Sequence, residues 1–252
     1  MKIISYRKIK NNEYELTLDN NQRVNLYDDI IIKHELLFKK EIADISLKSI
    51  ISENNRLEAY YLALKYLNTK MRSVLETDDY LKKQGYNKTN RTFTIDKLKK
   101  EKYLDEKKFM ESYINAQYNL TNNGPERIRK NLMKLGIEEE KIIINMDFDF
   151  KINNLIKKKS KANHKLSTSA LKLNINNYLI SLGYPKELFK DKLDNIKVND
   201  ASLIKKDYEK LLKKFGNKYD ELKLNLVLKQ KLYQKGYPKE LINDIINGVE
   251  DV

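Results

Sequence analysis

Hydrophobic and polar residues alternate at the start of the chain. Tyr14, Leu16 and Leu18 alternate with polar neighbours, and residues 23–27 alternate again after a turn-like run of polar residues. A period of two residues predicts β-strands, and residues 3–9 supply a third candidate strand. We therefore expect a small β-meander at the N-terminus.

From Asp28 onward the apolar residues recur at intervals of three and four, which is the spacing of amphipathic helices. We expect a short helix at residues 31–38 and then a second helix with Asp44 or Ser46 as its N-cap. The β-meander and these linking helices form the first expected segment, residues 1–56.

Four stretches share the pattern Leu-x-x-x-Gly followed by Tyr or Ile, and they lie at 81–86, 132–137, 179–184 and 232–237. Glycine suits the left-handed residue that ends a helix, and the Schellman ending brings the Leu and the Tyr or Ile into apolar contact. The glycines are 51, 47 and 53 residues apart (136−85, 183−136, 236−183), and the chain has only seven. Four ordinary helix ends would also show this motif, but the near-constant spacing favours an internal repeat.

Further candidate helices flank each glycine-terminated helix, so each motif is expected within a unit of three helices. The last two units also share the string Gly-Tyr-Pro-Lys-Glu-Leu. A three-helix unit cannot bury its apolar face alone, whereas stacked units bury it against one another. We therefore expect a mostly α fold in which tandem three-helix repeats stack into an elongated, curved solenoid behind the small N-terminal β-meander. The expected repeats are residues 57–104, 105–150, 151–198 and 199–252.

Capping residues predict details of the first two repeats. Ser73 and Asp105 are placed to start helices, and Pro125 suits the first turn of the glycine-terminated helix of repeat two. A polar loop is expected at residues 87–91. A third helix is expected to close repeat two around residues 138–146.

Composition argues against several classes of function. The 252 residues include no Cys and two His, so a disulfide is excluded and a zinc site would depend mostly on carboxylates. Neither a phosphate-binding glycine loop nor a Gly-x-Ser-x-Gly elbow occurs in the sequence. No apolar run approaches the length of a membrane span. We expect a cytoplasmic protein that is not an enzyme and that uses no cofactor, metal or membrane.

Charge indicates a polyanionic partner. The net charge is +14, which suits nucleic acid, an acidic protein surface or an anionic membrane, although a lysine-rich composition of the source proteome would also produce it. From Lys151 to Lys172 there are seven Lys and no acidic residue, and a solvated helix face is the alternative interpretation of such a run. Lys and Arg neutralise phosphates regardless of sequence. The candidate contacts to DNA or to a protein filament are Lys70, Arg72, Arg127, Arg129, Lys130, Lys134, Lys157, Lys158, Lys159 and Lys161.

The central part of the chain carries longer recognisable stretches. They are ALKYLNTKMRSVLETDDYLKKQGY (63–86), IDKLKKEKYLDEKKFMESYINAQ (95–117) and the run from Gly124 to Ile137. With these stretches, residues 59–137 resemble the RecX family of recombinase regulators. The sequence departs from the family's Arg-x-Arg-Ser, which appears here as Lys-Met-Arg-Ser at 70–73.

The resemblance implies tandem three-helix repeats and, in the longer members, an additional N-terminal part. It also implies a non-enzymatic modulator of the RecA recombinase that acts in homologous recombination and DNA repair. We expect this protein to be a monomer. Such proteins bind the filament of RecA on single-stranded DNA and typically oppose its activity. Some also bind single-stranded or double-stranded DNA directly.

Two other functions fit the same residues. One is a stand-alone DNA-binding protein whose repeats hold duplex or single-stranded DNA. The other is a scaffold or enzyme subunit whose basic surface reflects composition alone. Weak, unspecific and steeply salt-dependent DNA binding would favour the recombinase regulator over the stand-alone DNA-binding protein.

Overall fold

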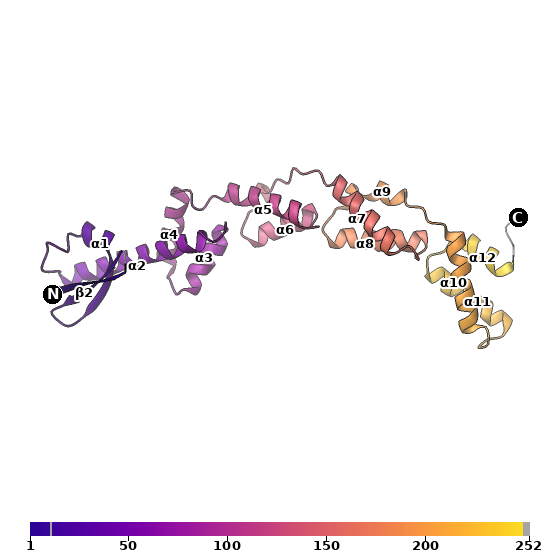
Figure 1. Ribbon diagram of the computed structural model, residues 1–252, viewed down its shortest axis with the longest axis horizontal. Coiled ribbons are helices and arrows are strands. Elements are labelled where there is room, and N and C mark those ends of the chain that lie inside the picture. Colours follow the sequence, from indigo (N-terminus) through magenta and orange to yellow (C-terminus); the bar gives the residue numbers. More distant parts are fainter. Residues whose placement is uncertain (11, 249–252) are drawn as a thin grey trace. The chain divides into compact units, whose positions relative to one another are not determined.

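The structure is a computed structural model that describes residues 1–10 and 12–248 (Figure 1). Its described residues divide into two compact units. Unit 1 comprises Met1–Tyr113 and Leu132–Ile142. Unit 2 comprises Ile114–Asn131 and the described part of Ile143–Val252. Most of the chain is helical, as the sequence predicts.

A three-stranded antiparallel sheet begins the chain and confirms the predicted β-meander. The strands β1 (Ile3–Lys10), β2 (Glu13–Leu18) and β3 (Arg23–Tyr27) lie in the order β1-β2-β3. In the register of β2 and β3, Leu16 is opposite Val24. Both side chains are buried together with others from α1 and α2, so one face of the sheet covers a core.

The two linking helices differ from the sequence prediction in their ends. Helix α1 spans only Asp28–Lys33, because Glu35 takes a positive φ of 54° and ends the expected longer helix. Helix α2 spans Asp44–Leu67 as one helix of 24 residues. Its N-cap is Ala43, which makes no side-chain capping bond, so the predicted cap at Asp44 or Ser46 is wrong.

Helix α3 (Val74–Lys83) starts where the sequence predicts. The Ser73 hydroxyl accepts a hydrogen bond from the Glu76 N–H, and the Glu76 carboxylate accepts one from the Ser73 N–H, which completes a capping box. Helix α4 (Lys88–Lys100) includes most of the residues predicted to form a polar loop, so the prediction of a loop is wrong. The Asn87 side chain accepts from the Asn90 N–H and starts a helix within the polar run.

Repeat two has two α-helices, α5 (Glu106–Leu120) and α6 (Pro125–Lys134). Asp105 caps α5 as predicted, since its carboxylate accepts a hydrogen bond of 3.0 Å from the Lys108 N–H. The predicted third helix at 138–146 is wrong, because only the short 3-10 turn η1 (Glu139–Lys141) forms there. Three β-branched residues follow at 142–144, and such residues lose side-chain freedom in a helix.

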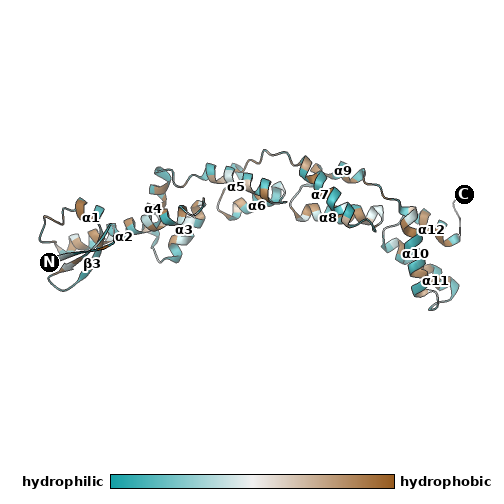
Figure 2. Ribbon diagram, in the orientation of Figure 1, coloured by the Kyte–Doolittle hydropathy of each residue, from teal (hydrophilic) through white to brown (hydrophobic). Residues whose placement is uncertain are grey.

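The remaining helices come in two groups. The first group contains α7 (Asp149–Ala162), α8 (Thr168–Ser181), the 3-10 turn η2 (Lys186–Leu188) and α9 (Lys190–Asp194). The second contains α10 (Asp200–Phe215), α11 (Glu221–Gln234) and α12 (Lys239–Asn247). Hydrophobic and hydrophilic residues alternate around the helices in Figure 2, as expected for amphipathic elements with one buried side. No helix among the described residues is both long and apolar enough to span a membrane.

The four predicted glycine endings are confirmed. Gly85, Gly136, Gly183 and Gly236 have φ values of 90°, 88°, 86° and 84°. In each ending the N–H after the glycine donates to the carbonyl of the Leu four residues before that glycine, as between Ile137 and Leu132 at 3.1 Å. The four Leu side chains are fully buried. They are Leu81, Leu132, Leu179 and Leu232.

Three of these glycines also pack against the first turn of an earlier glycine-terminated helix. A Cβ built on Gly136 would lie 2.9 Å from Leu75 Cβ, and one on Gly183 would lie 2.5 Å from the backbone nitrogen of Arg127. A Cβ on Gly236 would lie 2.9 Å from Ser167 Oγ. Leu75, Arg127 and Ser167 lie at the starts of α3, α6 and α8, and each contact lies within one unit. These three junctions between helix ends and helix starts are thus of one type.

Candidate nucleic-acid interface

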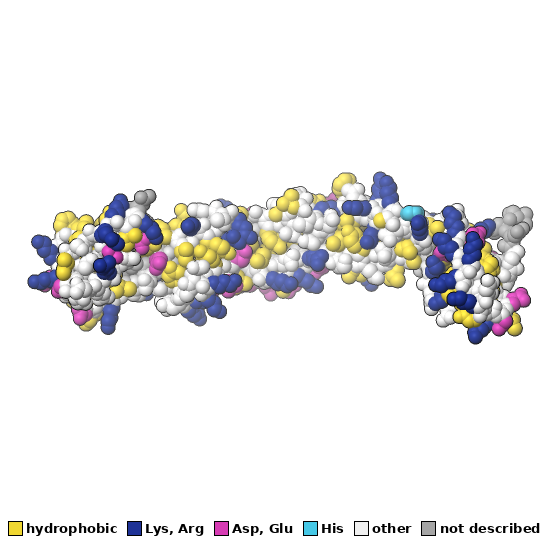
Figure 3. All heavy atoms as spheres, turned by 60° about the horizontal axis from the view of Figure 1, so that its bottom comes forward, with side chains coloured by type: hydrophobic (Ala, Val, Ile, Leu, Met, Phe, Trp, Pro, Cys, Tyr) yellow, Lys and Arg dark blue, Asp and Glu magenta, His cyan; other side chains and the backbone are white. Residues whose placement is uncertain are grey.

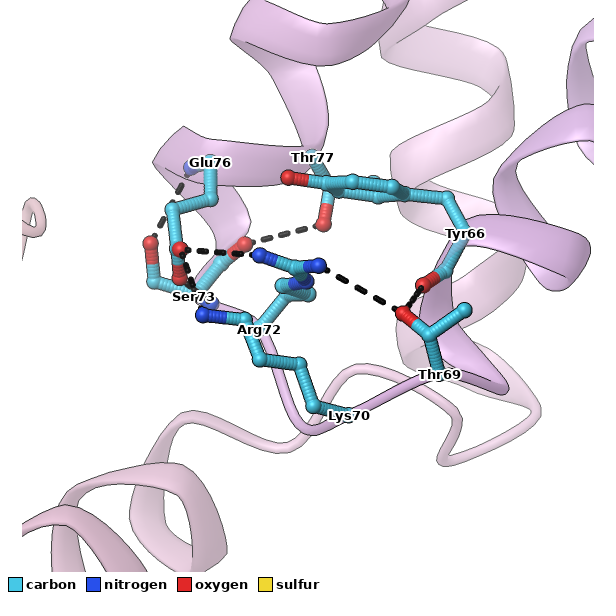
Figure 4. Close-up of polar contacts among 7 residues, drawn as sticks. All are labelled: Tyr66, Thr69, Lys70, Arg72, Ser73, Glu76 and Thr77. Carbon is cyan, nitrogen blue, oxygen red and sulfur yellow. Dashed lines mark hydrogen bonds and ion pairs between the residues drawn. The ribbon is translucent and has the colours of Figure 1, made fainter.

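Arg72 belongs to a polar network at the start of α3 (Figure 4). Its guanidinium carbon lies 4.3 Å from the centroid of the Tyr66 ring, and its Nη1 lies 3.7 Å from the Glu76 carboxylate. The Lys70 ammonium lies 3.9 Å from the same carboxylate. Because Glu76 also completes the capping box of α3, both cations neutralise a carboxylate that holds the helix start.

Both faces of the Tyr66 ring are covered. The Tyr80 ring is stacked on it with centroids 4.0 Å apart and an interplanar angle of 7°. The guanidinium and the Tyr80 ring cannot occupy the same face, so Arg72 covers the other. The Arg72 side chain is 18% exposed, and its Nε is buried without a hydrogen-bond partner among the described residues. Arg72 therefore orders the connection between α2 and α3, while Lys70, with its side chain 59% exposed, faces solvent.

Helix α6 carries the second group of predicted contacts. Arg127, Lys130 and Lys134 are exposed, and Arg129 is half-buried. Arg127 and Lys130 are three residues apart and so lie on one face of the helix. Within residues 1–10 and 12–248, no carboxylate lies within ion-pair distance of Arg127, Lys130 or Lys134. These three cations are available to an external anion.

The lysine run at 151–172 divides into structural and free side chains. Lys151 donates hydrogen bonds to the carbonyls of Tyr118 and Thr121 at the end of α5, and burial lowers the pKa of its ammonium. Lys172 donates to the Asp194 carbonyl at 3.0 Å. The Lys159 ammonium lies 4.4 Å from the centroid of the Tyr178 ring. These three lysines stabilise the fold around α7 and α8.

Lys157, Lys158 and Lys161 are the exposed members of the run that α7 holds. No carboxylate in the described part of the chain pairs with any of them. Lys157 and Lys161 are four residues apart and share a face of the helix. The predicted contacts on α7 thus remain as a small group of unpaired charges.

Helix α10 carries a cationic group that the sequence analysis missed. Lys206, Lys210 and Lys213 are exposed and recur at intervals of four and three residues, so they lie on one face. Figure 3 shows Lys and Arg side chains gathered over the last repeat, which contains α10. The helical spacing of these lysines was the available signal, but the intervening acidic residues Asp207 and Glu209 hid it in a count along the sequence.

The described residues offer no set of three His, Asp or Glu side chains that would hold a metal ion. The chemistry of the cationic groups is instead that of anion binding. Lysine and arginine side chains on exposed helix faces attract phosphates without reading bases. Any such interaction would weaken steeply as the salt concentration rises.

No family model matches the chain. Individual relatives do match over most of their length. A regulatory protein RecX of Bacillus thuringiensis subsp. konkukian is 30% identical over 223 residues, which cover 82% of this chain and 81% of the relative. The chain belongs to the RecX family. The resemblance stated from residues 59–137 is confirmed.

Two further comparisons extend the family match. The regulatory protein RecX of Streptococcus uberis is 29% identical over 258 residues, which cover 99% of this chain and all of the relative. A solved crystal structure of a regulatory protein RecX has a TM-score of 0.67 at 19% identity, over 77% of this chain and 100% of that chain. At that identity the likeness shows a shared fold, and the relatives are named as regulatory proteins.

Proposed function

We propose that this protein is a non-enzymatic regulator of homologous recombination that binds RecA filaments on single-stranded DNA in the cytoplasm and inhibits RecA. Family membership supports the regulatory role. The observation that carries the binding mode is the set of exposed, unpaired cations on α6, α7 and α10. We propose that they attach the protein to filament phosphates or to acidic filament surface, and that stacked repeats align them along the filament.

The predicted contact residues take different roles in this proposal. Lys70 and the exposed cations of α6 and α7 contact the polyanion. Arg72 and Lys159 have structural roles through cation–π contacts: Arg72 orders the connection between α2 and α3, and Lys159 of α7 contacts Tyr178 of α8. The cations of α10 join the contact surface as a new group.

The decisive experiment measures RecA ATPase activity and strand exchange on single-stranded DNA with increasing amounts of this protein. Inhibition at stoichiometric amounts is expected. A variant with Lys157, Lys158 and Lys161 changed to Gln should inhibit less, because it loses the proposed contacts on α7. The control changes Lys39, Lys40 and Lys48 to Gln, which removes the same three charges elsewhere. No effect of the unmodified protein on RecA at stoichiometric excess would remove the proposal.

The alternative is a stand-alone DNA-binding protein, which the same free cations support. It predicts sequence-preferring binding to duplex DNA without RecA. A gel shift at two salt concentrations separates the two functions, because phosphate contacts alone give unspecific binding that falls steeply with salt.

A further inference from the structure

A cavity of about 740 Å³ lies within unit 1, between α1, α2 and α4. Helix α2 contributes Ser49, Ser52 and Arg56, which lie at intervals of three and four residues and share one face. Helix α4 contributes Phe93 and Lys97, also four residues apart. The cavity is therefore lined by two helix faces that combine hydroxyls, cations and an aromatic ring.

The carboxylates of this cavity already have partners. Glu53 accepts hydrogen bonds from Lys33 and, at 2.8 Å, interacts with the His34 ring. The hydrogen bond from Lys33 holds the pKa of Glu53 below its ordinary value, so this carboxylate is ionised near neutral pH and is already paired with Lys33. Asp29 accepts a hydrogen bond of 2.6 Å from the Tyr61 hydroxyl. Among the residues that the structure describes, neither carboxylate forms an ion pair or a hydrogen bond with Arg56 or Lys97.

Arg56 and Lys97 lack an anionic partner within the part of the chain that the structure describes. The Arg56 Nε is buried and has no hydrogen-bond partner there. A buried donor without an acceptor is unfavourable, and no carboxylate compensates the charge of Arg56, so the rest of its guanidinium can take an external anion. Lys97 lies 3.9 Å from the centroid of the Tyr60 ring, which fixes its direction without neutralising it.

Phe93 gives the cavity a second kind of recognition. Its side chain remains 44% exposed although it lines the cavity, and the Arg56 guanidinium lies 5.5 Å from its ring centroid. A partly exposed aromatic ring beside cations is the combination with which proteins hold single strands, because unpaired bases stack on the ring and phosphates meet the cations. Bases within a duplex are already stacked and cannot reach a recessed ring in this way.

We propose that this cavity is a binding site for single-stranded nucleic acid, in which Arg56 and Lys97 contact phosphate and Phe93 stacks an unpaired base. The serine hydroxyls of α2 supply additional hydrogen bonds to the strand. The site deepens the proposed function, because it adds a strand contact that neither Lys70 nor the cations of α6, α7 and α10 provide.

The test measures binding of fluorescently labelled oligo(dT) to the full chain by anisotropy, without RecA and at two salt concentrations. Arg56→Gln and Lys97→Gln should each weaken binding about tenfold, and each should reduce the salt slope by about 0.7. Lys99→Gln is the matched control, since Lys99 is exposed on the same helix and does not line the cavity. Equal effects of Lys97→Gln and Lys99→Gln would overturn the proposal.

Base stacking is tested separately from charge. Phe93→Leu should weaken binding of oligo(dT) by about five- to tenfold and leave binding of an abasic strand unchanged. Phe38→Leu is the control, because Phe38 is 86% exposed and lies outside the cavity. Equal losses on both strands, or equal losses in the two Phe variants, would contradict the stacking contact.

Two further measurements keep the test independent of folding and of RecA. The unmodified protein should photocrosslink iododeoxyuridine strands at Phe93, and crosslinks confined to other helices would overturn the site. Polyglutamate should compete poorly at equal ionic strength, whereas tighter binding than oligo(dT) would identify a carboxylate site instead. RecA inhibition is not a readout here, so a failure of the proposed function leaves these outcomes interpretable.

Discussion

Gly124 and Gly183 lie backbone against backbone, although 59 residues separate them (183−124). The Gly124 N–H donates a hydrogen bond of 2.8 Å to the carbonyl of Leu182, the residue before Gly183. A Cβ on Gly124 would lie 2.5 Å from the Gly183 carbonyl oxygen. The start of α6 thus meets the end of α8 at a distance that a side chain at position 124 would prevent.

This junction satisfies groups that helix ends leave without partners. The Glu126 N–H donates to the Gly183 carbonyl at 3.0 Å. At the equivalent junction of the last two repeats, the Ser167 hydroxyl donates to the Lys235 carbonyl at 2.6 Å. In both cases the first turn of one helix contacts the last carbonyls of another, where the helix dipoles attract.

The junction predicts unequal costs for the same substitution. Gly85→Ala should cost about 1–2 kcal/mol of stability, because its φ of 90° is unfavourable for Ala but no atom lies within 4 Å of the new Cβ. Gly183→Ala should cost about 1–3 kcal/mol more, because its Cβ would also collide with the Arg127 backbone. Urea unfolding followed by circular dichroism measures both. Equal losses would show that the glycines serve only as helix ends.

Arg72→Ala is expected to lower the free energy of unfolding by about 1–2 kcal/mol, because it removes the cation stacked on Tyr66 and an ion pair with Glu76. Lys70→Ala is the control, since its ion pair is longer and largely exposed. Thermal unfolding compares the two variants, and DNA affinity is measured alongside. A large loss of DNA affinity in Arg72→Ala without a change in stability would instead assign Arg72 to direct contact.

Glu53 should make stability depend on acid pH. Its hydrogen bonds from Lys33 and His34 hold its pKa below the ordinary value of 4.5 in the folded protein. The associated stabilisation is present above that ordinary value and is lost as the pH falls through the lowered pKa. Glu53→Gln should therefore destabilise the protein at neutral pH and flatten its stability profile below about pH 4.5. Parallel profiles of the variant and the unmodified protein would contradict this linkage.

Lys151→Met tests whether Lys151, the first residue of the lysine run, stabilises the fold. The Lys151 ammonium donates to the Thr121 carbonyl at 2.7 Å and lies 4.6 Å from the centroid of the Tyr118 ring. Loss of these contacts should cost about 1–2 kcal/mol of stability. Lys158→Met, which removes an exposed charge from the same helix, should leave stability within about 0.5 kcal/mol. Chemical denaturation of both variants provides the comparison.

Local signals explain which parts of the fold were predictable. The glycine endings and the caps at Ser73 and Asp105 depend on residues that are neighbours in sequence. The polar run at 87–91 includes the N-cap of α4, Asn87, although the polarity of the run favours a loop. The helix predicted at 138–146 does not form. Its acidic residues suit the first turn of a helix, but the three β-branched residues that follow them disfavour one.

The candidate contacts were less predictable because they depend on distant neighbours. Nothing near Arg72 in the sequence shows that Tyr66 and Tyr80 stack, or that the guanidinium completes that stack. Likewise, the cavity beside Arg56 requires α1, α2 and α4 to come together. Charge counts along the sequence therefore missed the cationic face of α10 and did not separate structural cations from exposed ones.

The cationic face of α10 provides a test of the proposed attachment to a polyanion. Changing Lys206, Lys210 and Lys213 to Gln should reduce the salt slope of single-stranded DNA binding by about 2, because each phosphate contact contributes about 0.7. The control changes Lys39, Lys40 and Lys48 to Gln, which removes the same charge from unit 1. If only the overall charge matters, the two triple variants will lose equal affinity. A larger loss in the α10 variant, together with weaker RecA inhibition, is expected if that helix face contacts the filament.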